Sequence, residues 1–176
     1  MQNILIHVCC APCFVSIYKE LKGDFNVSAL WFNGNIHPYL EYNKRLDTVR
    51  DFIKIEGIDY IEINNYGLVD FLQKSVFKEE ERCFHCYYDR LAQTAMLGKE
   101  KNYDYFTTSL LYSKFQKHEM LKEIGISVAN KHQIEFYYSD FRELWKEGIA
   151  LSKERNMYRQ QYCGCIYSEY ERHCKS

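Results

Sequence analysis

The sequence predicts a single α/β domain with a parallel β-sheet flanked by helices and a helical carboxyl-terminal part. Its 176 residues are enough for one domain with a full hydrophobic core and few for two. A composition of 47% hydrophobic and 27% charged residues suits a globular protein and excludes a disordered one. Short β-branched runs alternate with amphipathic stretches, which is typical of parallel strands joined by right-handed crossovers. We therefore expect one domain over residues 1–176.

Each element is predicted from a local pattern. A buried β-branched run ends at Val8, and Pro12 then stands where a helix can begin. Gly57 follows a long charged amphipathic stretch and is expected to end that helix. The expected strands cover residues 4–8, 27–32, 60–63, 105–109 and 134–137, and the expected helices cover residues 14–21, 39–56, 71–81, 87–99, 116–124 and 141–155.

The charge balance and the apolar pattern exclude several classes of protein. With 23 basic and 24 acidic residues, the chain is not a strongly cationic nucleic-acid binder, so any RNA contact must come from a local patch. No apolar run approaches the roughly 20 residues of a membrane span, and the first eight residues fit a strand better than a signal peptide. We therefore expect a cytoplasmic protein with no membrane partner. The glycine-rich phosphate loop of nucleotide hydrolases is also missing after the first strand.

Cysteine is the most informative residue type in this sequence. Seven of the 8 cysteines fall into three tight clusters. In a reducing compartment such thiols bind metals or catalyse reactions more often than they form disulfides. Because sites in open α/β sheets form at the carboxyl ends of strands, we expect the clusters to meet at that edge of the sheet. The clusters are Cys9, Cys10 and Cys13, then Cys83 and Cys86, then Cys163 and Cys165.

The cysteine spacing leaves two kinds of chemistry open. Two close pairs, one at Cys9 to Cys13 and one at Cys83 and Cys86, can supply four thiolates to zinc or to an iron–sulfur cluster. A structural zinc site is the alternative, although zinc usually staples small units with poor cores. Cys163-Gly164-Cys165 can form a strained, labile disulfide, or the two thiols can be further metal ligands or core residues.

Polar residues after the strands and in the tail are candidates for binding a substrate. The stretch 33–45 is dense in polar groups after the second strand, although an ordinary loop entering a helix explains it equally well. Ser109 stands at the end of the fourth expected strand, where a hydroxyl can hold a ligand or begin a helix. The tail offers aromatic faces and amides that can read a nucleobase, or an aromatic core stripe. The candidates are Asn33, Asn35, Arg45, Ser109, Tyr158, Arg159 and Gln160.

Two histidines stand near these clusters. Lone His7 is expected to be a strand histidine with satisfied hydrogen bonds rather than a ligand. His85 lies between Cys83 and Cys86, where it can serve as a proton donor or simply face the solvent.

Several motifs, taken in order, resemble the QueH-type epoxyqueuosine reductases from about residue 3 to residue 172. Each motif is moderately specific, whereas their order and joint presence are highly specific. The chain departs from the family pattern at Lys114-Phe115, where Pro-Tyr is expected, and at Leu144-Trp145, while Cys174 matches no motif. The matching stretches are Cys9-Cys10-Ala11-Pro12-Cys13, residues 33–45, Cys83-x-x-Cys86, residues 108–111 and residues 158–168.

The resemblance implies a fold and a reaction. The fold would be of the adenine-nucleotide-hydrolase-like (HUP) type, with cysteines in place of its phosphate loop. The reaction would be the reduction of epoxyqueuosine in tRNA to queuosine without cobalamin, the last step of queuosine biosynthesis. The partners would be tRNA and an electron donor that the sequence does not reveal.

The resemblance also implies roles for the cysteines. Cys9, Cys10, Cys83 and Cys86 match the ligands of a [4Fe–4S] cluster. Cys163 and Cys165 match a redox-active pair, and Cys13 is a candidate ligand and catalytic residue for a separate mononuclear iron. Two other functions stay open. One is a structural zinc module that binds RNA or a partner without catalysis. The other is an iron–sulfur enzyme of tRNA sulfuration or ATP-driven modification.

Overall fold

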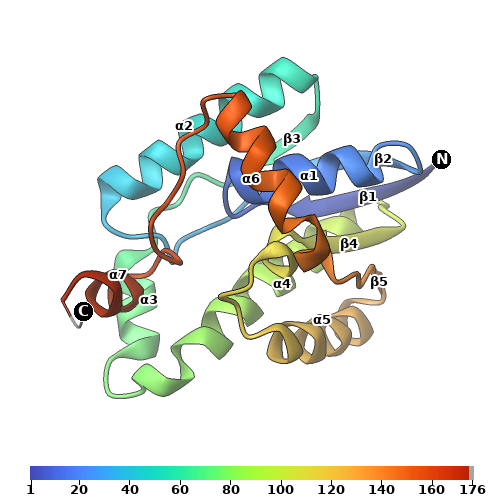
Figure 1. Ribbon diagram of the computed structural model, residues 1–176. Coiled ribbons are helices and arrows are strands. Elements are labelled where there is room, and N and C mark those ends of the chain that lie inside the picture. Colours follow the sequence, from blue (N-terminus) through green and yellow to red (C-terminus); the bar gives the residue numbers. More distant parts are fainter. Residues whose placement is uncertain (175–176) are drawn as a thin grey trace.

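A five-stranded sheet organises the computed structural model, which describes residues 1–174. The strand order is β3-β2-β1-β4-β5, and all pairs are parallel, as predicted from the alternating pattern (Figure 1). The predicted domain of 1–176 extends two residues beyond the described part. The strands are β1 (Gln2–His7), β2 (Phe25–Trp31), β3 (Asp59–Glu62), β4 (Tyr105–Thr108) and β5 (Glu135–Phe136).

Helices cover both faces of the sheet. In Figure 1, α1, α2 and α6 lie over one face, whereas α4 and α5 lie over the other, with α3 beside α4. Within residues 1–174, no helix has both the length and the apolar character that a membrane crossing requires. The helices are α1 (Ala11–Leu21), α2 (Tyr39–Glu56), α3 (Leu68–Ser75), α4 (Arg82–Glu100), α5 (His118–His132), α6 (Trp145–Glu154) and α7 (Ile166–His173).

The central strand explains the apolar run at the start of the sequence. Ile4, Leu5 and Ile6 of β1 are fully buried, because β1 pairs with β2 and β4 and has helices on both faces. A strand buried on both faces needs a continuous apolar run rather than an alternating one. The core therefore surrounds the strand that leads directly into the first cysteine cluster.

Several predicted boundaries differ from the structure. Cys83-Phe84-His85-Cys86 is the first turn of α4 and not a separate turn, because a spacing of three also fits one face of a helix. The helix predicted over 71–81 is divided. Its first part ends at Ser75, Phe77 has a left-handed backbone (φ 65°), and a 3-10 turn follows.

The carboxyl-terminal half shows two further differences. α5 extends to His132, eight residues beyond the predicted end, and stops where Gln133 adopts a left-handed conformation. The tail contains α7, to which the sequence analysis assigned no boundaries. Cys165 is the N-cap of α7, and its sulfur accepts a hydrogen bond from the Ser168 amide.

Candidate functional site

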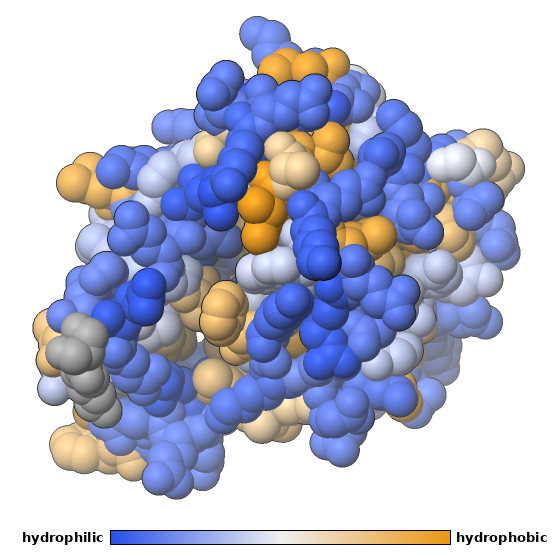
Figure 2. Space-filling view, in the orientation of Figure 1, coloured by the Kyte–Doolittle hydropathy of each residue, from blue (hydrophilic) through white to orange (hydrophobic). Residues whose placement is uncertain are grey.

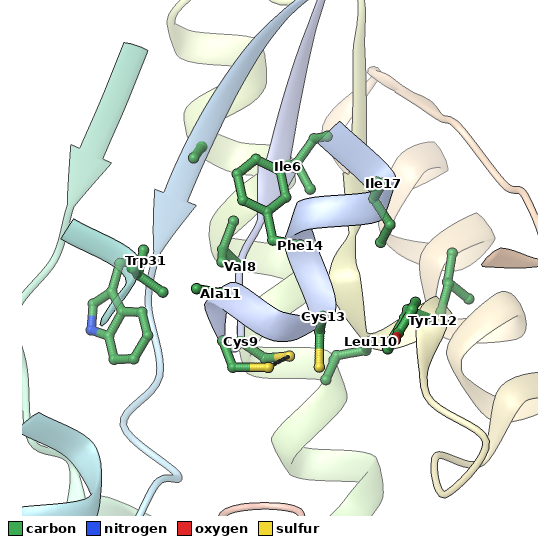
Figure 3. Close-up of a cluster of buried hydrophobic side chains, with 14 of the residues drawn as sticks. Ile6, Val8, Cys9, Ala11, Cys13, Phe14, Ile17, Trp31, Leu110 and Tyr112 are labelled. Carbon is green, nitrogen blue, oxygen red and sulfur yellow. Dashed lines mark hydrogen bonds between the residues drawn. The ribbon is translucent and has the colours of Figure 1, made fainter. Parts of the chain in front are cut away.

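The first cysteine cluster forms a buried triad at the carboxyl end of β1. Cys9 and Cys10 lie between β1 and α1, and Cys13 lies in the first turn of α1. Their three sulfur atoms are within 4.8 Å of one another, and all three residues are buried. In Figure 3 the sulfurs of Cys9 and Cys13 point to the same side, away from the ring of Phe14. Three converging sulfur donors at the positive end of a helix can hold a metal.

Two polar side chains donate hydrogen bonds to these sulfurs. The Ser109 hydroxyl donates to the Cys9 sulfur at 3.2 Å, and the Cys9 amide donates back to the Ser109 oxygen at 2.9 Å. The Gln160 amide donates to the sulfurs of Cys10 at 2.8 Å and Cys13 at 3.4 Å. Because such bonds favour the thiolate, both side chains support sulfur atoms that carry negative charge.

The three thiols do not titrate alike. Hydrogen bonds from Cys10, then Cys13, and then Ser109 lower the pKa of Cys9 well below its usual value. Burial raises the pKa of Cys10, and donation of its proton toward Cys10 and Cys9 raises the pKa of Cys13. The triad therefore favours one thiolate supported by two thiols, an arrangement whose remaining protons a metal displaces on binding.

The other four clustered cysteines form a second group beside the triad. Burial raises the pKa of Cys86 to about 12, and the charges of Cys163, Cys165 and Cys83 act on it in the same direction. All four are free thiols, and they lie outside the close triad. The structure thus brings Cys83 and Cys86 near Cys163 and Cys165 and keeps the pair Cys9 and Cys10 with Cys13.

Arg90 connects the two groups. Its buried guanidinium donates to the Cys86 sulfur at 2.7 Å and to the Cys86 carbonyl at 3.1 Å. Burial acts to lower the pKa of Arg90, but the charges of Cys86, Cys163 and Cys9 outweigh it and raise that pKa above its usual value. One cation therefore interacts with thiols of all three sequence clusters.

Asn33, Ser109 and Arg45 are buried candidate binding residues that hold the site together. The Asn33 amide donates to the Val8 carbonyl at 2.8 Å, and its oxygen lies 3.1 Å from the His7 ring. Ser109 is fully buried against Cys9. Arg45 is also buried, and its guanidinium forms an ion pair with Glu41 at 2.7 Å. These side chains position the site from within.

Arg45 and Glu41 also fix the segment that carries Cys163. Arg45 donates to the carbonyl oxygens of Cys163 at 2.8 Å and Tyr162 at 3.0 Å, while the Tyr158 hydroxyl donates to Glu41. The Cys163 residue is exposed, and the Gln116 amide donates to its sulfur at 3.2 Å. The same irregular segment carries Gln160, whose side chain contacts the sulfurs of the triad, so the segment lies against the triad.

Asn35 and Arg159 have different surroundings from these three residues. Asn35 lines a cavity of about 350 Å³ between α3 and α4, which also reaches Cys86 and Arg90. The side-chain oxygen of Asn35 is buried without a hydrogen-bond partner in the described part of the chain. Arg159 is exposed between Tyr158 and Gln160. Arg159 is therefore open to the solvent, whereas Asn35 is buried at the border of the cavity.

The two histidines have different surroundings. His7 is fully buried between Thr108, at 2.9 Å, and the oxygens of Asn33 and Phe32. Burial lowers the pKa of His7 to about 3, so the ring is neutral and its hydrogen bonds are satisfied, as predicted. His85 is half-buried at the cavity, with its ring nitrogen 3.7 Å from Glu81.

Three residues that contact this site are not among the predicted site residues. Glu41 and Arg90 stand four positions before Arg45 and after Cys86, respectively, so the helical i,i+4 spacing was a usable signal for both. Gln116 carried no such signal, because its partner Cys163 is 47 residues away.

The fold and the site together define an α/β protein with a buried cysteine triad, able to hold a metal, at the carboxyl end of its parallel sheet. The family model of epoxyqueuosine reductase QueH matches residues 4–171. The chain therefore belongs to the QueH epoxyqueuosine reductase family.

Individual relatives agree with this assignment. An epoxyqueuosine reductase QueH from Dehalococcoides mccartyi is 35% identical over 97% of this chain and 94% of its own length. The QueH protein of Thermotoga maritima is 31% identical over 98% of this chain and 93% of its own length. The QueH protein of Helicobacter pylori is 36% identical over 94% of this chain and 49% of its own length.

A solved structure supports the fold. It is described as a predicted subunit of a tRNA methyltransferase from Methanocaldococcus jannaschii, and it superposes with a TM-score of 0.50 at 14% identity. The match covers 92% of this chain and 94% of the other. At this identity the likeness concerns the fold alone, and it agrees with a HUP-like α/β architecture.

Proposed function

We propose that this protein reduces epoxyqueuosine in tRNA to queuosine. The observation that carries the proposal is the family match over residues 4–171, which includes the cysteines gathered at the carboxyl end of the sheet. In the reaction, both carbon–oxygen bonds of the epoxide break and an alkene forms. Two electrons and two protons enter, and the oxygen leaves as water.

We also propose that Cys9, Cys10, Cys83 and Cys86 hold a [4Fe–4S] cluster. Four thiolates are the usual ligands of such a cluster, which supplies electrons at a potential that its surroundings set. The donor set fits, because one pair belongs to the buried triad, the other begins α4, and Arg90 interacts with both pairs. Cys13 is then a further sulfur beside the cluster, available to a mononuclear iron.

Cys163 and Cys165 suit the role of a redox-active pair. Two thiols that become a disulfide release two electrons and two protons, which is the number that the epoxide requires. Gly164 between them has a φ of 153°, a conformation that favours glycine, and Arg45 holds the neighbouring carbonyls. Because Cys163 is exposed, an external electron donor can reach it and reduce the pair again.

The modified nucleoside would bind where open space meets the thiols. The partnerless oxygen of Asn35 can accept a hydrogen bond from a hydroxyl or N–H group of the nucleoside, within the cavity that reaches Cys86. Tyr158, Arg159 and Gln160 would line the other side of the site, while Asn33, Arg45 and Ser109 keep it in shape. The face shown in Figure 2 is hollowed between the side that carries α7 and the centre of the molecule.

An exposed aromatic residue near Cys163 suits the flanking nucleotides of tRNA. Phe115 is 82% exposed and precedes Gln116, which contacts the Cys163 sulfur. Its ring meets Trp145 edge-on at 5.8 Å, and Lys114 lies over the same Trp145 ring. Bases of single-stranded RNA stack on such rings, and nearby cations attract the phosphates. This is the local patch that a chain of nearly neutral charge needs for binding tRNA.

The decisive experiment combines metal analysis with an activity assay. Protein purified without oxygen should be brown and contain about four irons and four sulfides per chain. Given dithionite and tRNA that carries epoxyqueuosine, it should produce queuosine, measured by mass spectrometry of the digested nucleosides. Colourless, inactive protein with one zinc would instead favour the structural zinc module, and binding of ATP would favour a nucleotide-driven modification enzyme.

The thiol content also suits a particular compartment. Exposed or partly exposed free cysteines persist in a reducing environment, so we place the protein in the cytoplasm as a single metal-binding reductase domain over residues 1–176.

A further inference from the structure

Two buried arginines lie beside the thiols, and their charges are balanced in different ways. Arg45 is 2% exposed and forms an ion pair with Glu41 at 2.7 Å. Arg90 is 3% exposed, and among residues 1–174 no carboxylate lies within 4.0 Å of its guanidinium. Its hydrogen-bond acceptors are the carbonyl and the sulfur of Cys86.

An arginine in this position keeps its charge. The guanidinium does not lose its proton in proteins, and a buried charge is costly unless an opposite charge compensates it. The described groups around Arg90 that can carry negative charge are the thiol of Cys86, which is in contact, the thiols of Cys163 and Cys9, and the phenol of Tyr87, whose pKa burial raises. The surroundings of Arg90 therefore fit a permanent cation whose partner is a group of thiolates.

Helix α4 fixes the position of Arg90 relative to Cys83 and Cys86. Cys83, Cys86 and Arg90 lie at positions i, i+3 and i+7 of α4, so they share one face of the helix. The same face is directed toward the carboxyl end of β1, where Cys9 lies. Arg90 thus contacts one of the two cysteine pairs that we propose as cluster ligands, through Cys86, and its charge also interacts with Cys9 of the other pair.

We infer that Arg90 is the positioning residue that sets the reduction potential of the iron–sulfur site, by holding one fixed positive charge against its thiolates. The inference rests on the proposed cluster. In a redox titration, one electron passes from dithionite to the cluster, whose net charge becomes more negative by one. Arg90 favours that reduced form through its charge and through its hydrogen bond to the Cys86 sulfur, because charge and hydrogen bonding to sulfur both raise cluster potentials.

The test is a redox titration followed by electron paramagnetic resonance on the full chain, with iron and sulfide measured in each sample. Arg90→Met and Arg90→Gln both remove the charge, and Gln keeps a hydrogen-bond donor in case Met prevents folding. Both should shift the midpoint potential to more negative values, whereas Arg90→Lys should retain most of the wild-type potential.

Arg82→Met is the matched control, because Arg82 begins the same helix near Cys83 but is already paired with Glu171 at 2.6 Å. Its shift should be clearly smaller than that of Arg90→Gln. Equal potentials in wild type and Arg90→Gln, with the cluster intact, would overturn the inference and leave the proposed function standing. Colourless wild-type protein would overturn the cluster proposal and the role of Arg90 together.

Discussion

The amino-terminal cysteine triad and the carboxyl-terminal cysteine pair are held in contrasting ways. The triad follows the buried end of the central strand, and all its members are buried. The pair lies on an irregular segment after α6, where Cys163 is exposed and the backbone is held by the side chain of Arg45. Sulfur donors fixed to the core suit the retention of a metal, whereas an exposed thiol on a separately anchored segment suits exchange of electrons with a partner.

Removing a triad sulfur should have the largest effect. Cys10→Ser takes away one of the four proposed cluster ligands, and a buried one, so we expect almost complete loss of iron and sulfide, measured chemically on protein purified without oxygen. The control is Cys174→Ser, because Cys174 is exposed and outside all three clusters. Full metal content in Cys10→Ser would show that the triad does not hold the cofactor.

A substitution in the carboxyl-terminal cysteine pair should abolish turnover without changing the metal content. In Cys163→Ser we expect iron and sulfide to stay at the wild-type level, because Cys163 is not among the proposed cluster ligands. Multiple turnover of epoxyqueuosine tRNA should nevertheless be lost, since the remaining thiol cannot form the disulfide. Unchanged turnover would refute the redox role, and lost iron would assign Cys163 to the metal instead.

The buried ion pair of Glu41 and Arg45, which holds the segment that carries Cys163, should contribute measurably to the free energy of unfolding. Glu41→Gln leaves the buried Arg45 cation without its carboxylate, so we expect the free energy of unfolding to fall by about 3 kcal/mol, measured by denaturant titration. Asp47→Asn, on the same helix, removes an exposed partner of Arg50 and should change it by less than about 0.5 kcal/mol. Similar values for both variants would contradict the anchoring role.

The smallest expected effect concerns tRNA. Phe115→Ala should weaken binding of an anticodon stem–loop about fivefold, measured by fluorescence anisotropy, since one stacked base contributes about 1 kcal/mol or more. Phe77→Ala is the control, because Phe77 is 93% exposed but lies in the turn after α3. If both variants bind like the wild type, Phe115 is not a stacking platform.

Much of the fold was predictable because its signals are local. The β-branched run of β1 and the charged stretch of α2 each specify one kind of element, and the bounds of α2 were predicted without error. The triad could also be predicted, because its members are close in sequence and follow a strand. The break expected between the helices predicted over 71–81 and 87–99 was wrong at Cys83 to Cys86, since a spacing of three does not distinguish a turn from a helix.

The contacts between distant segments could not be predicted in this way. Gln160 and Cys10 are 150 positions apart, and Arg90 looks like any cation of an amphipathic helix until the fold buries it. Burial and charge balance depend on how helices pack against the sheet, and one sequence does not contain that information locally.

The position of Gln160 above the triad has a consequence for the order of assembly. All the proposed cluster ligands lie within the first 86 residues, whereas the segment that crosses them begins after α6. During synthesis the ligands therefore leave the ribosome well before their cover does, since a chain emerges from its amino terminus. Iron and sulfide can be delivered to the nascent chain while the site is still uncovered, and the last stretch of translation then closes it.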